Sequence, residues 1–282
     1  MRAAAKPARQ RPAVTRSTPS ERDALFVRSV EKGFRVLSVF GSGRSTLSLG
    51  QIATAAKLDK SAAQRFTYTL EALGYLRKDP ETKRFELTTR ALDLGYHYTR
   101  ASPLVERSLP YLMHLSRETE ETVSLTVLDA TEVVYVSRFM SRFMLNTKVI
   151  IGSRLPAYCT APGRAMLASM SVQDAHAVLR RSDLRAFTPH TIYKMPQLLA
   201  ELEQAAHRGY AIAAEEIYPN DISIASVALG GKGEVLGAVS VAVSKLRCPA
   251  ADAEARFAPL VMAAAQAMSQ ARPLGAFSGP DR

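Results

Sequence analysis

The sequence predicts an α+β protein of two units, a helical N-terminal unit that ends in a hairpin and a C-terminal unit built around an antiparallel sheet. Three observations support this prediction. Three helical patterns precede a strand-turn-strand pattern, most of the excess positive charge lies in the same part of the chain, and strand and amphipathic-helix patterns fill the remainder. With 282 residues, the chain is long enough for two domains with separate cores.

Charge is distributed very unevenly along the chain. The whole sequence has 37 Lys+Arg and 26 Asp+Glu, a net charge of +11. Residues 1–90 hold 18 basic and 8 acidic residues, whereas residues 91–282 hold 19 and 18. Such asymmetry is typical of a segment that binds a polyanion, joined to an electrically ordinary domain. A solvated basic surface is the alternative, and the size of the asymmetry favours nucleic acid.

The N-terminal arm and the two cysteines indicate the compartment. Residues 1–24 are basic and contain prolines without an apolar stretch, so we expect a disordered arm rather than a secretory signal. Cys159 and Cys248 lie too far apart in the sequence to suggest a disulfide framework, which favours a reducing cytoplasm. No run approaches the ~20 apolar residues of a membrane span, so no membrane partner is expected.

Residues 25–88 contain three helical patterns and a hairpin. The first pattern places one apolar stripe inward, formed by Val27, Val30, Phe34, Leu37 and Phe40. The second begins after Ser48, which suits an N-cap, and turns Leu49, Ile52, Ala53 and Ala56 inward. The third begins after Asp59 and has a core face formed by Ala62, Phe66, Leu70, Leu73 and Leu76.

The opposite face of the third helix carries hydrogen-bond donors at helical spacing. Its members are Lys60, Ser61, Gln64, Arg65 and Tyr68. The hairpin "GYLRKDPETKRFELT" follows, and its tip carries Arg77, Lys78, Lys83 and Arg84. This order of elements is that of a winged helix-turn-helix, whose second and third helices form the DNA-reading pair.

On this interpretation, double-stranded DNA is the partner of the third helix. Gln64 and Arg65 have forked donors that suit adenine and guanine edges in the major groove. Lys60 and Ser61 would hold phosphate at the helix start, and the basic wing residues would contact flanking backbone. The alternative is a surface helix of a small α/β domain.

The rest of the chain predicts a connecting helix over residues 89–102 and then the α+β domain. Two strands surround the turn Asp129-Ala130-Thr131-Glu132, and a third strand ends in Gly152. Helices follow in "PGRAMLASMSVQDAHAVLRR" and "PQLLAELEQAAHRGY". A strand hairpin turns at residues 230–233, and an amphipathic helix closes the domain.

The segment "YCTAPGRAML" predicts a capped helix start. Thr160 suits an N-cap and Pro162 suits the first turn. The N–H groups of Ala161, Gly163 and Arg164 would point out of that helix start, where a carboxylate binds well. A capped packing helix without a ligand is the alternative.

The phrases "GSRLPAYCTAPGRAMLA" and "RGYAIAAEE", together with the order of elements, resemble the IclR family of bacterial transcriptional regulators. The resemblance covers residues 25–270. It implies a winged helix (25–88), a dimerising linker helix (89–102), a GAF-like effector domain (103–272) and a flexible tail (273–282). It also implies homodimers, often paired as tetramers, on palindromic operator DNA.

The same resemblance implies an effector pocket for a small molecule. Its walls would include Met144 and Leu155, its floor Ser223 and Ser240, and its small-residue turn Ala161 and Gly163. Pro162 departs from the family pattern because it removes one N–H donor, and Ala213 replaces the acid of keto-acid binders. These departures, with "SRLPAYCT" and "NDIS", favour an aromatic carboxylate. Asp221 either reaches this pocket or caps a turn.

An enzyme or sensor that uses Cys159 at the helix start is the alternative function. A lowered thiol pKa is possible at such a position, but a nucleophile also needs a positioned base. The five histidines show no recognisable pairing with Cys159, and the sequence has neither CxxC nor HExxH spacing. We therefore expect no catalytic residues, no metal and no cofactor.

Overall fold

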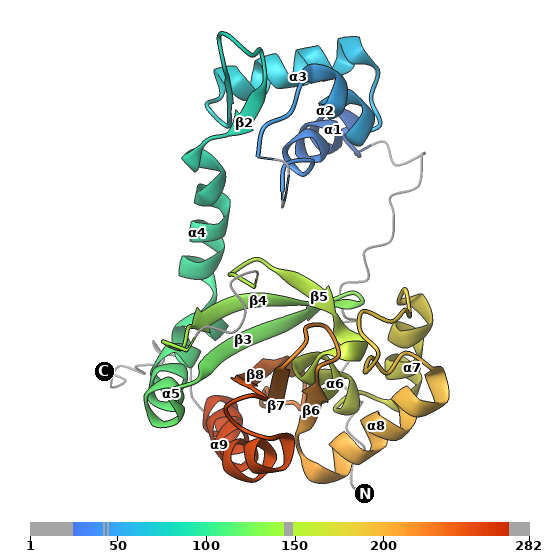
Figure 1. Cartoon of the computed structure of the whole chain (residues 1–282). Helices are drawn as coiled ribbons and strands as arrows, with labels where there is room; N and C mark the ends of the chain where they lie inside the picture. Colours follow the sequence, from blue (N-terminus) through green and yellow to red (C-terminus); the bar gives the residue numbers. More distant parts are fainter. Residues whose placement is uncertain (1–24, 42, 44, 144–148, 271–282) are drawn as a thin grey trace, which may run out of the picture. The chain divides into compact units, whose positions relative to one another are not determined.

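The computed structural model describes residues 25–41, 43, 45–143 and 149–270. The chain divides into two compact units, Met1–Tyr98 and Thr99–Arg282 (Figure 1). The predicted arm (1–24) and tail (273–282) lie outside the described residues, as does Met144. In the part of the chain that is described, no helix combines the length and apolar character needed to cross a membrane.

The N-terminal unit has the predicted order of three helices and a hairpin. Ser48 caps the second helix in a capping box with Gln51, and Asp59 caps the third by accepting the Ala62 N–H at 2.7 Å. Both caps are local features, which explains why the sequence predicts them correctly. The elements are α1 (Arg28–Leu37), α2 (Leu49–Ala55), α3 (Lys60–Ala72), β1 (Leu76–Lys78) and β2 (Phe85–Leu87).

The core of this unit differs from the predicted one in two helices. The inward residue of α1 is Val36, whereas Val27, Val30 and Phe34 are 57%, 55% and 55% exposed. The prediction was wrong because an apolar stripe does not show whether it faces its own core or another surface. In α3, the fully buried face is formed by Ala63, Thr67 and Leu70, while Leu73 is 52% exposed.

A helical segment follows the wing, as predicted. The short helix η1 (Thr89–Ala91) leads into α4 (Leu92–Ala101), and none of the α4 residues is buried. Ser102 caps the next helix, α5 (Pro103–Thr119), by accepting the Val105 N–H. The predicted break at Ser102-Pro103 therefore separates two helices.

The C-terminal unit contains a six-stranded antiparallel sheet in the order β5-β4-β3-β8-β7-β6. The strand predicted to end in Gly152 is wrong: described residues 149–153 lack strand structure, and β5 begins after them. The short strand β6 was not predicted, because four small residues carry little strand pattern. The strands are β3 (Thr122–Asp129), β4 (Glu132–Phe139), β5 (Arg154–Pro156), β6 (Ala211–Ala214), β7 (Asp221–Leu229) and β8 (Val235–Ser244).

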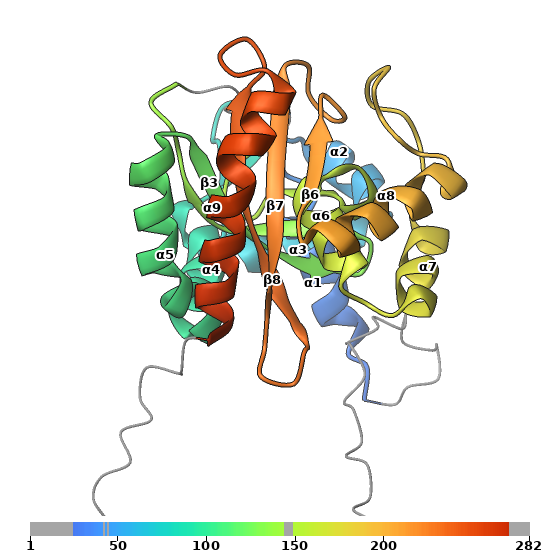
Figure 2. The same cartoon turned by 90° about the horizontal axis from the view of Figure 1, so that it is seen from below.

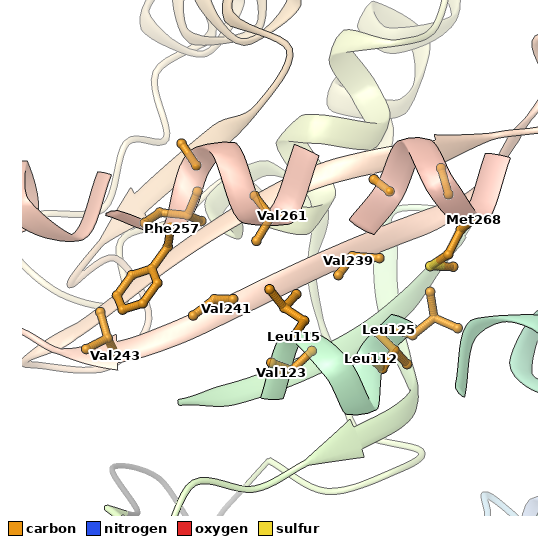
Figure 3. Close-up of a cluster of buried hydrophobic side chains, with 14 of the residues drawn as sticks. Leu112, Leu115, Val123, Leu125, Val239, Val241, Val243, Phe257, Val261 and Met268 are labelled. Carbon is orange, nitrogen blue, oxygen red and sulfur yellow. The ribbon is translucent and has the colours of Figure 1, made fainter. Parts of the chain in front are cut away.

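The two faces of this sheet are chemically different because side chains alternate along each strand. Large aliphatic residues on one face pack against α5 and α9 (Ala250–Gln270), which cover that face (Figure 2). Figure 3 shows this core, in which Leu112, Val241 and Phe257 are fully buried. The opposite face carries small residues such as Ser124, Ser240 and Ala225.

Small residues allow close packing on that second face. Helix α6 (Ala161–Ala168) contacts β7 and β8 there and meets the sheet through Ala161 and Ala165. The short helix η2 (Ala157–Cys159) leads into α6. Helices α7 (Val172–Arg181) and α8 (Met195–Arg208) pack beside it.

We predict that Gly163→Ala destabilises the C-terminal unit. A Cβ at this position would lie 2.1 Å from the Ala157 carbonyl oxygen, so η2 or α6 must shift. The expected loss in the free energy of unfolding is at least about 1–3 kcal/mol, measured by urea unfolding followed by circular dichroism. Gly231→Ala is the control, because no atom lies within 4 Å of its added Cβ. Equal stability of the two variants would contradict the prediction.

Candidate functional site

The candidate DNA-binding surface lies on α3, opposite its buried face. Lys60, Ser61, Gln64 and Arg65 are exposed, and Tyr68 is 72% exposed. The first two residues of the helix, directly after the Asp59 cap, are Lys60 with a charged donor and Ser61 with a hydroxyl donor. The five predicted residues therefore form one solvent-facing surface, as their spacing requires.

The wing residues have more internal contacts than the sequence suggests. Arg84 donates to the Thr46 carbonyl at 2.8 Å and to Gln51 Oε1 at 3.1 Å, so it fixes the wing to the start of α2. Arg77 Nε donates to Glu86 at 2.7 Å, and Lys83 Nζ donates to the Pro80 carbonyl at 2.6 Å. Lys78 is exposed and lies over the Phe85 ring. Arg84 therefore supports the wing from inside, in contrast to its predicted place at an exposed tip.

The C-terminal unit has a cavity on the small-residue face of the sheet. Three of the predicted effector residues, Leu155, Ser223 and Ser240, line it together. Ser223 and Ser240 belong to the floor, and Leu155 lies on β5 at the sheet edge. The complete lining is Ser124, Tyr135, Arg138, Val149, Leu155, Cys159, Thr160, Ala213, Glu216, Ile217, Tyr218, Asp221, Ser223, Ser240 and Ala242.

The donors predicted at the helix start lie outside the cavity lining. Ala161 and Gly163 are buried and do not line the cavity. The Gly163 N–H donates to the Thr160 hydroxyl at 3.3 Å, and the Arg164 N–H donates to the Thr160 carbonyl at 2.9 Å. Pro162 has no N–H, and the cap and the first helical turn already use the N–H groups of Gly163 and Arg164.

Arg138 is the cavity residue that the sequence prediction missed. It lies on β4 opposite Ser124, and its Nη1 donates to the Ser124 hydroxyl at 3.0 Å. Its guanidinium carbon is 5.6 Å from the centroid of the Tyr135 ring. Among the described residues, its buried Nε finds no hydrogen-bond partner. A single positive charge near the end of the largely apolar strand "EVVYVSRF" is the signal that identifies Arg138 in the sequence.

Asp221 supplies the opposite charge in the same cavity. Loss of hydration raises the pKa of its carboxyl group to about 6, and the positive charge of Arg138 opposes that shift. Tyr135 is also buried, which raises the pKa of its phenol and keeps it neutral. The cavity lining therefore combines one cation, Arg138, with the carboxyl groups of Asp221 and Glu216 and several hydroxyls.

A buried ion pair holds the elements around the cavity. Arg164 is 1% exposed, and its two Nη atoms each donate to one oxygen of the Glu216 carboxylate at 2.6 Å. Arg164 Nε donates to the Tyr158 carbonyl at 2.8 Å, and Glu216 also accepts the Ile192 N–H at 2.9 Å. This pair joins α6 and η2 to the segment that follows β6.

The position of Cys159 does not favour the alternative function. Its side chain is 1% exposed, and burial, with the nearby Glu216 charge, raises the pKa of the thiol to about 12. A nucleophilic cysteine requires the opposite shift. Within the described ranges, no group of three His, Cys, Asp or Glu side chains could hold a metal ion.

Comparisons with known proteins find matches for both units of the chain. The family description "IclR helix-turn-helix domain" matches residues 29–80, and "Bacterial transcriptional regulator IclR C-terminal" matches residues 96–270. The Pca regulon regulatory protein of Pseudomonas putida is 30% identical over 245 residues, which cover 86% of this chain and 84% of that protein.

Two solved structures have a similar fold. A transcriptional regulator from Rhodococcus sp. RHA1 has a TM-score of 0.77 and 31% identity, covering 87% of this chain and 98% of its own. An IclR homologue from Microbacterium hydrocarbonoxydans, complexed with 4-hydroxybenzoate, has a TM-score of 0.72 and 22% identity. The match covers 86% of this chain and 97% of the homologue.

We predict that Asp221→Asn stabilises the protein without ligand above pH 6. The folded-state pKa of about 6 lies above the ordinary value of 3.8. Between these values the folded state keeps a proton that the unfolded state has lost, so stability falls as the pH rises through this window. The variant removes this penalty and should gain up to about 3 kcal/mol at neutral pH.

Urea unfolding of the full chain at about pH 4 and about pH 8 measures this effect. The advantage of Asp221→Asn should be large at the higher pH and small at the lower one. Glu203→Gln, at an exposed position on α8, is the control and should show no such pH dependence. The prediction fails if Asp221→Asn is no more stable than the original chain at the higher pH.

Proposed function

The chain belongs to the IclR family of bacterial transcriptional regulators, and on that premise we propose that it binds a palindromic operator as a homodimer or dimer of dimers and responds to a small aromatic carboxylate. The observation that carries the effector assignment is the cavity that contains Arg138. The proposed site of action is the cytoplasm, where the operator DNA would be.

The exposed face of α3 supports the DNA-reading part of the proposal. Gln64 and Arg65 would read base edges in the major groove, while Lys60 and Ser61 would hold phosphate. Lys78 is the wing cation best placed for flanking phosphate, because it is exposed and Arg84 is engaged within the domain. Base readout therefore rests on α3, and the wing contributes sequence-independent affinity.

Exposed apolar side chains support the dimer. Val27, Val30 and Phe34 on α1 are more than half exposed, and so are Leu92 and Leu94 on α4. Apolar surface of this kind is typical of interaction sites. A second copy of the chain would cover it and would place two reading helices on a palindrome, which a single winged helix cannot do.

The chemistry of the cavity supports a carboxylate effector. Arg138 presents a planar guanidinium with an unbonded Nε, which suits a carboxylate. Apolar side chains from Val149, Leu155 and Ile217 form walls that suit a ring. The Microbacterium homologue complexed with 4-hydroxybenzoate has the same fold, which adds an aromatic acid as a precedent.

Effector binding can change operator affinity only if the ligand binds two conformations of the dimer with different affinities. The element that joins the two units along the chain is α4. We therefore propose that α4 transmits the difference to the spacing of the two reading helices.

We predict that Arg65→Ala weakens binding to the native operator by about 1–3 kcal/mol and relaxes specificity at one base position, because a bidentate base contact is lost. Lys78→Ala should weaken binding to all sequences alike and reduce the salt slope by about 1. Fluorescence anisotropy with specific and random duplexes at several salt concentrations measures both. Lys194→Ala, at an exposed position before α8, is the control. Undiminished discrimination by Arg65→Ala would exclude the assigned role.

We predict that Arg138→Met weakens aromatic carboxylate binding by about tenfold or more, because a charge-assisted hydrogen bond contributes roughly 1.5–3 kcal/mol. Isothermal titration calorimetry of the full chain with 4-hydroxybenzoate measures the change. Arg154→Met is the matched control, since Arg154 lies on the adjacent strand and pairs with Asp129 and Glu132. If both variants bind like the original chain, the effector site lies elsewhere.

A further inference from the structure

The carboxyl group of Asp221 lies in the effector cavity without a hydrogen-bond donor of its own. Asp221 begins β7, and its backbone carbonyl accepts the Glu215 N–H at 2.6 Å. Its side chain lines the cavity, yet no described residue donates a hydrogen bond to it or forms an ion pair with it. Asp221 is half-buried, so its carboxyl group remains accessible within the cavity and can accept a hydrogen bond from a bound molecule.

Asp221 and Arg138 lie on opposite sides of the cavity floor. Pairing runs from Arg138 on β4 to Ser124 on β3, to Ser240 on β8 and to Ala225 on β7. Adjacent strands are about 4.8 Å apart, so about 14 Å separates the backbone of Arg138 from β7. Asp221 is an even number of residues from Ala225 and therefore shares its face of the sheet.

Small side chains separate these two charged groups. Ser240 and Ala242 on β8 and Ser223 on β7, the strand of Asp221, line the cavity floor. The charges interact with each other but form no ion pair among the described residues. One end of the cavity thus holds the unbonded Nε of Arg138. The other holds a carboxyl group that accepts no hydrogen bond from the described residues.

The other described groups around Asp221 donate no hydrogen bond to its carboxyl group. Tyr135 from β4 and Tyr218 from the segment before β7 face the cavity, as does the thiol of Cys159 from η2. Glu216 also lines it, but Arg164 holds its carboxylate. Among the described residues, only the Arg138 charge offsets the charge of Asp221, so a second negative charge near Asp221 would be repelled.

We propose that Asp221 determines effector specificity by accepting a hydrogen bond from a ring hydroxyl that lies opposite the carboxylate bound by Arg138. The preferred class is therefore a hydroxy-substituted aromatic acid. Aromatic acids that lack the donor bind more weakly, and aromatic dicarboxylates are excluded. This inference rests on the proposed function, since it assumes that Arg138 holds the carboxylate of the effector.

The test compares four para-substituted ligands by calorimetry on the full-length protein near neutral pH: 4-hydroxybenzoate, benzoate, 4-methoxybenzoate and terephthalate. We expect 4-hydroxybenzoate to bind at least about tenfold more tightly than benzoate or 4-methoxybenzoate, and terephthalate not to bind. Asp221→Asn should reduce the preference over 4-methoxybenzoate to below about threefold, because an amide can both donate and accept. Glu203→Gln, on the exposed surface of α8, should keep the original order.

A pH series on the unmodified chain makes the test independent of the variant. The Asp221 carboxyl becomes protonated as the pH falls below about 6 and is then a weaker acceptor. The preference for 4-hydroxybenzoate over 4-methoxybenzoate should therefore shrink between about pH 7.5 and about pH 5. The ratio of the two affinities cancels any effect of pH that acts equally on the binding of both ligands.

The possible failures are distinguishable. If the four acids bind with equal affinity and Arg138→Met abolishes binding, the effector site stands and the role of Asp221 is overturned. A preference that survives both Asp221→Asn and acid pH overturns it as well. If none of the acids binds, the proposed aromatic-acid effector and the specificity inference fail together.

Discussion

The buried pair between Arg164 and Glu216 is the interaction on which the C-terminal unit depends. Two charges are removed from water there, and they are tolerated because each is paired and further hydrogen-bonded. Removal of one partner from such a pair typically costs about 3–5 kcal/mol. The pair fixes α6 and η2 against the segment that follows β6, and these elements supply Cys159, Thr160 and Glu216 to the cavity lining.

The division of the sheet into two faces determines where a ligand can bind. Large aliphatic residues fill the first face under α5 and α9, where Val241 and Phe257 are fully buried (Figure 3). Serine and alanine on the second face leave room above the sheet. Gly163 allows α6 to lie close to η2, because an added Cβ would meet the backbone of Ala157. The small side chains that allow α6 to pack on this face also create the cavity. Arg138 and Asp221 then give that cavity its polarity.

Local features of the fold could be predicted from the sequence, whereas features that depend on distant partners could not. The caps at Ser48 and Asp59, the α3 surface and the turn after Asp129 follow from short-range patterns. The α1 stripe was misassigned because periodicity identifies an apolar face without identifying what covers it. The strand after Gly152 and the alanine-rich β6 have too little pattern to be predicted.

The candidate site shows the same limit. Leu155, Ser223 and Ser240 were correctly expected to share a cavity, because the family resemblance carries their positions. Arg138 was missed because the prediction placed the effector carboxylate at the start of α6. It did not take into account that the Gly163 N–H would bond to the Thr160 cap. Only the register of β4 against β3 shows that Arg138 faces the same space as Ser240.

A crystal structure of the full chain with 4-hydroxybenzoate tests the central claim most directly, because the two possible anion sites lie on different elements. The account predicts density for the ligand on the small-residue face of the sheet, with its carboxylate within hydrogen-bond distance of the Arg138 guanidinium. A carboxylate bound instead by the backbone at Ala161 and Gly163, or a ligand outside this cavity, would contradict it.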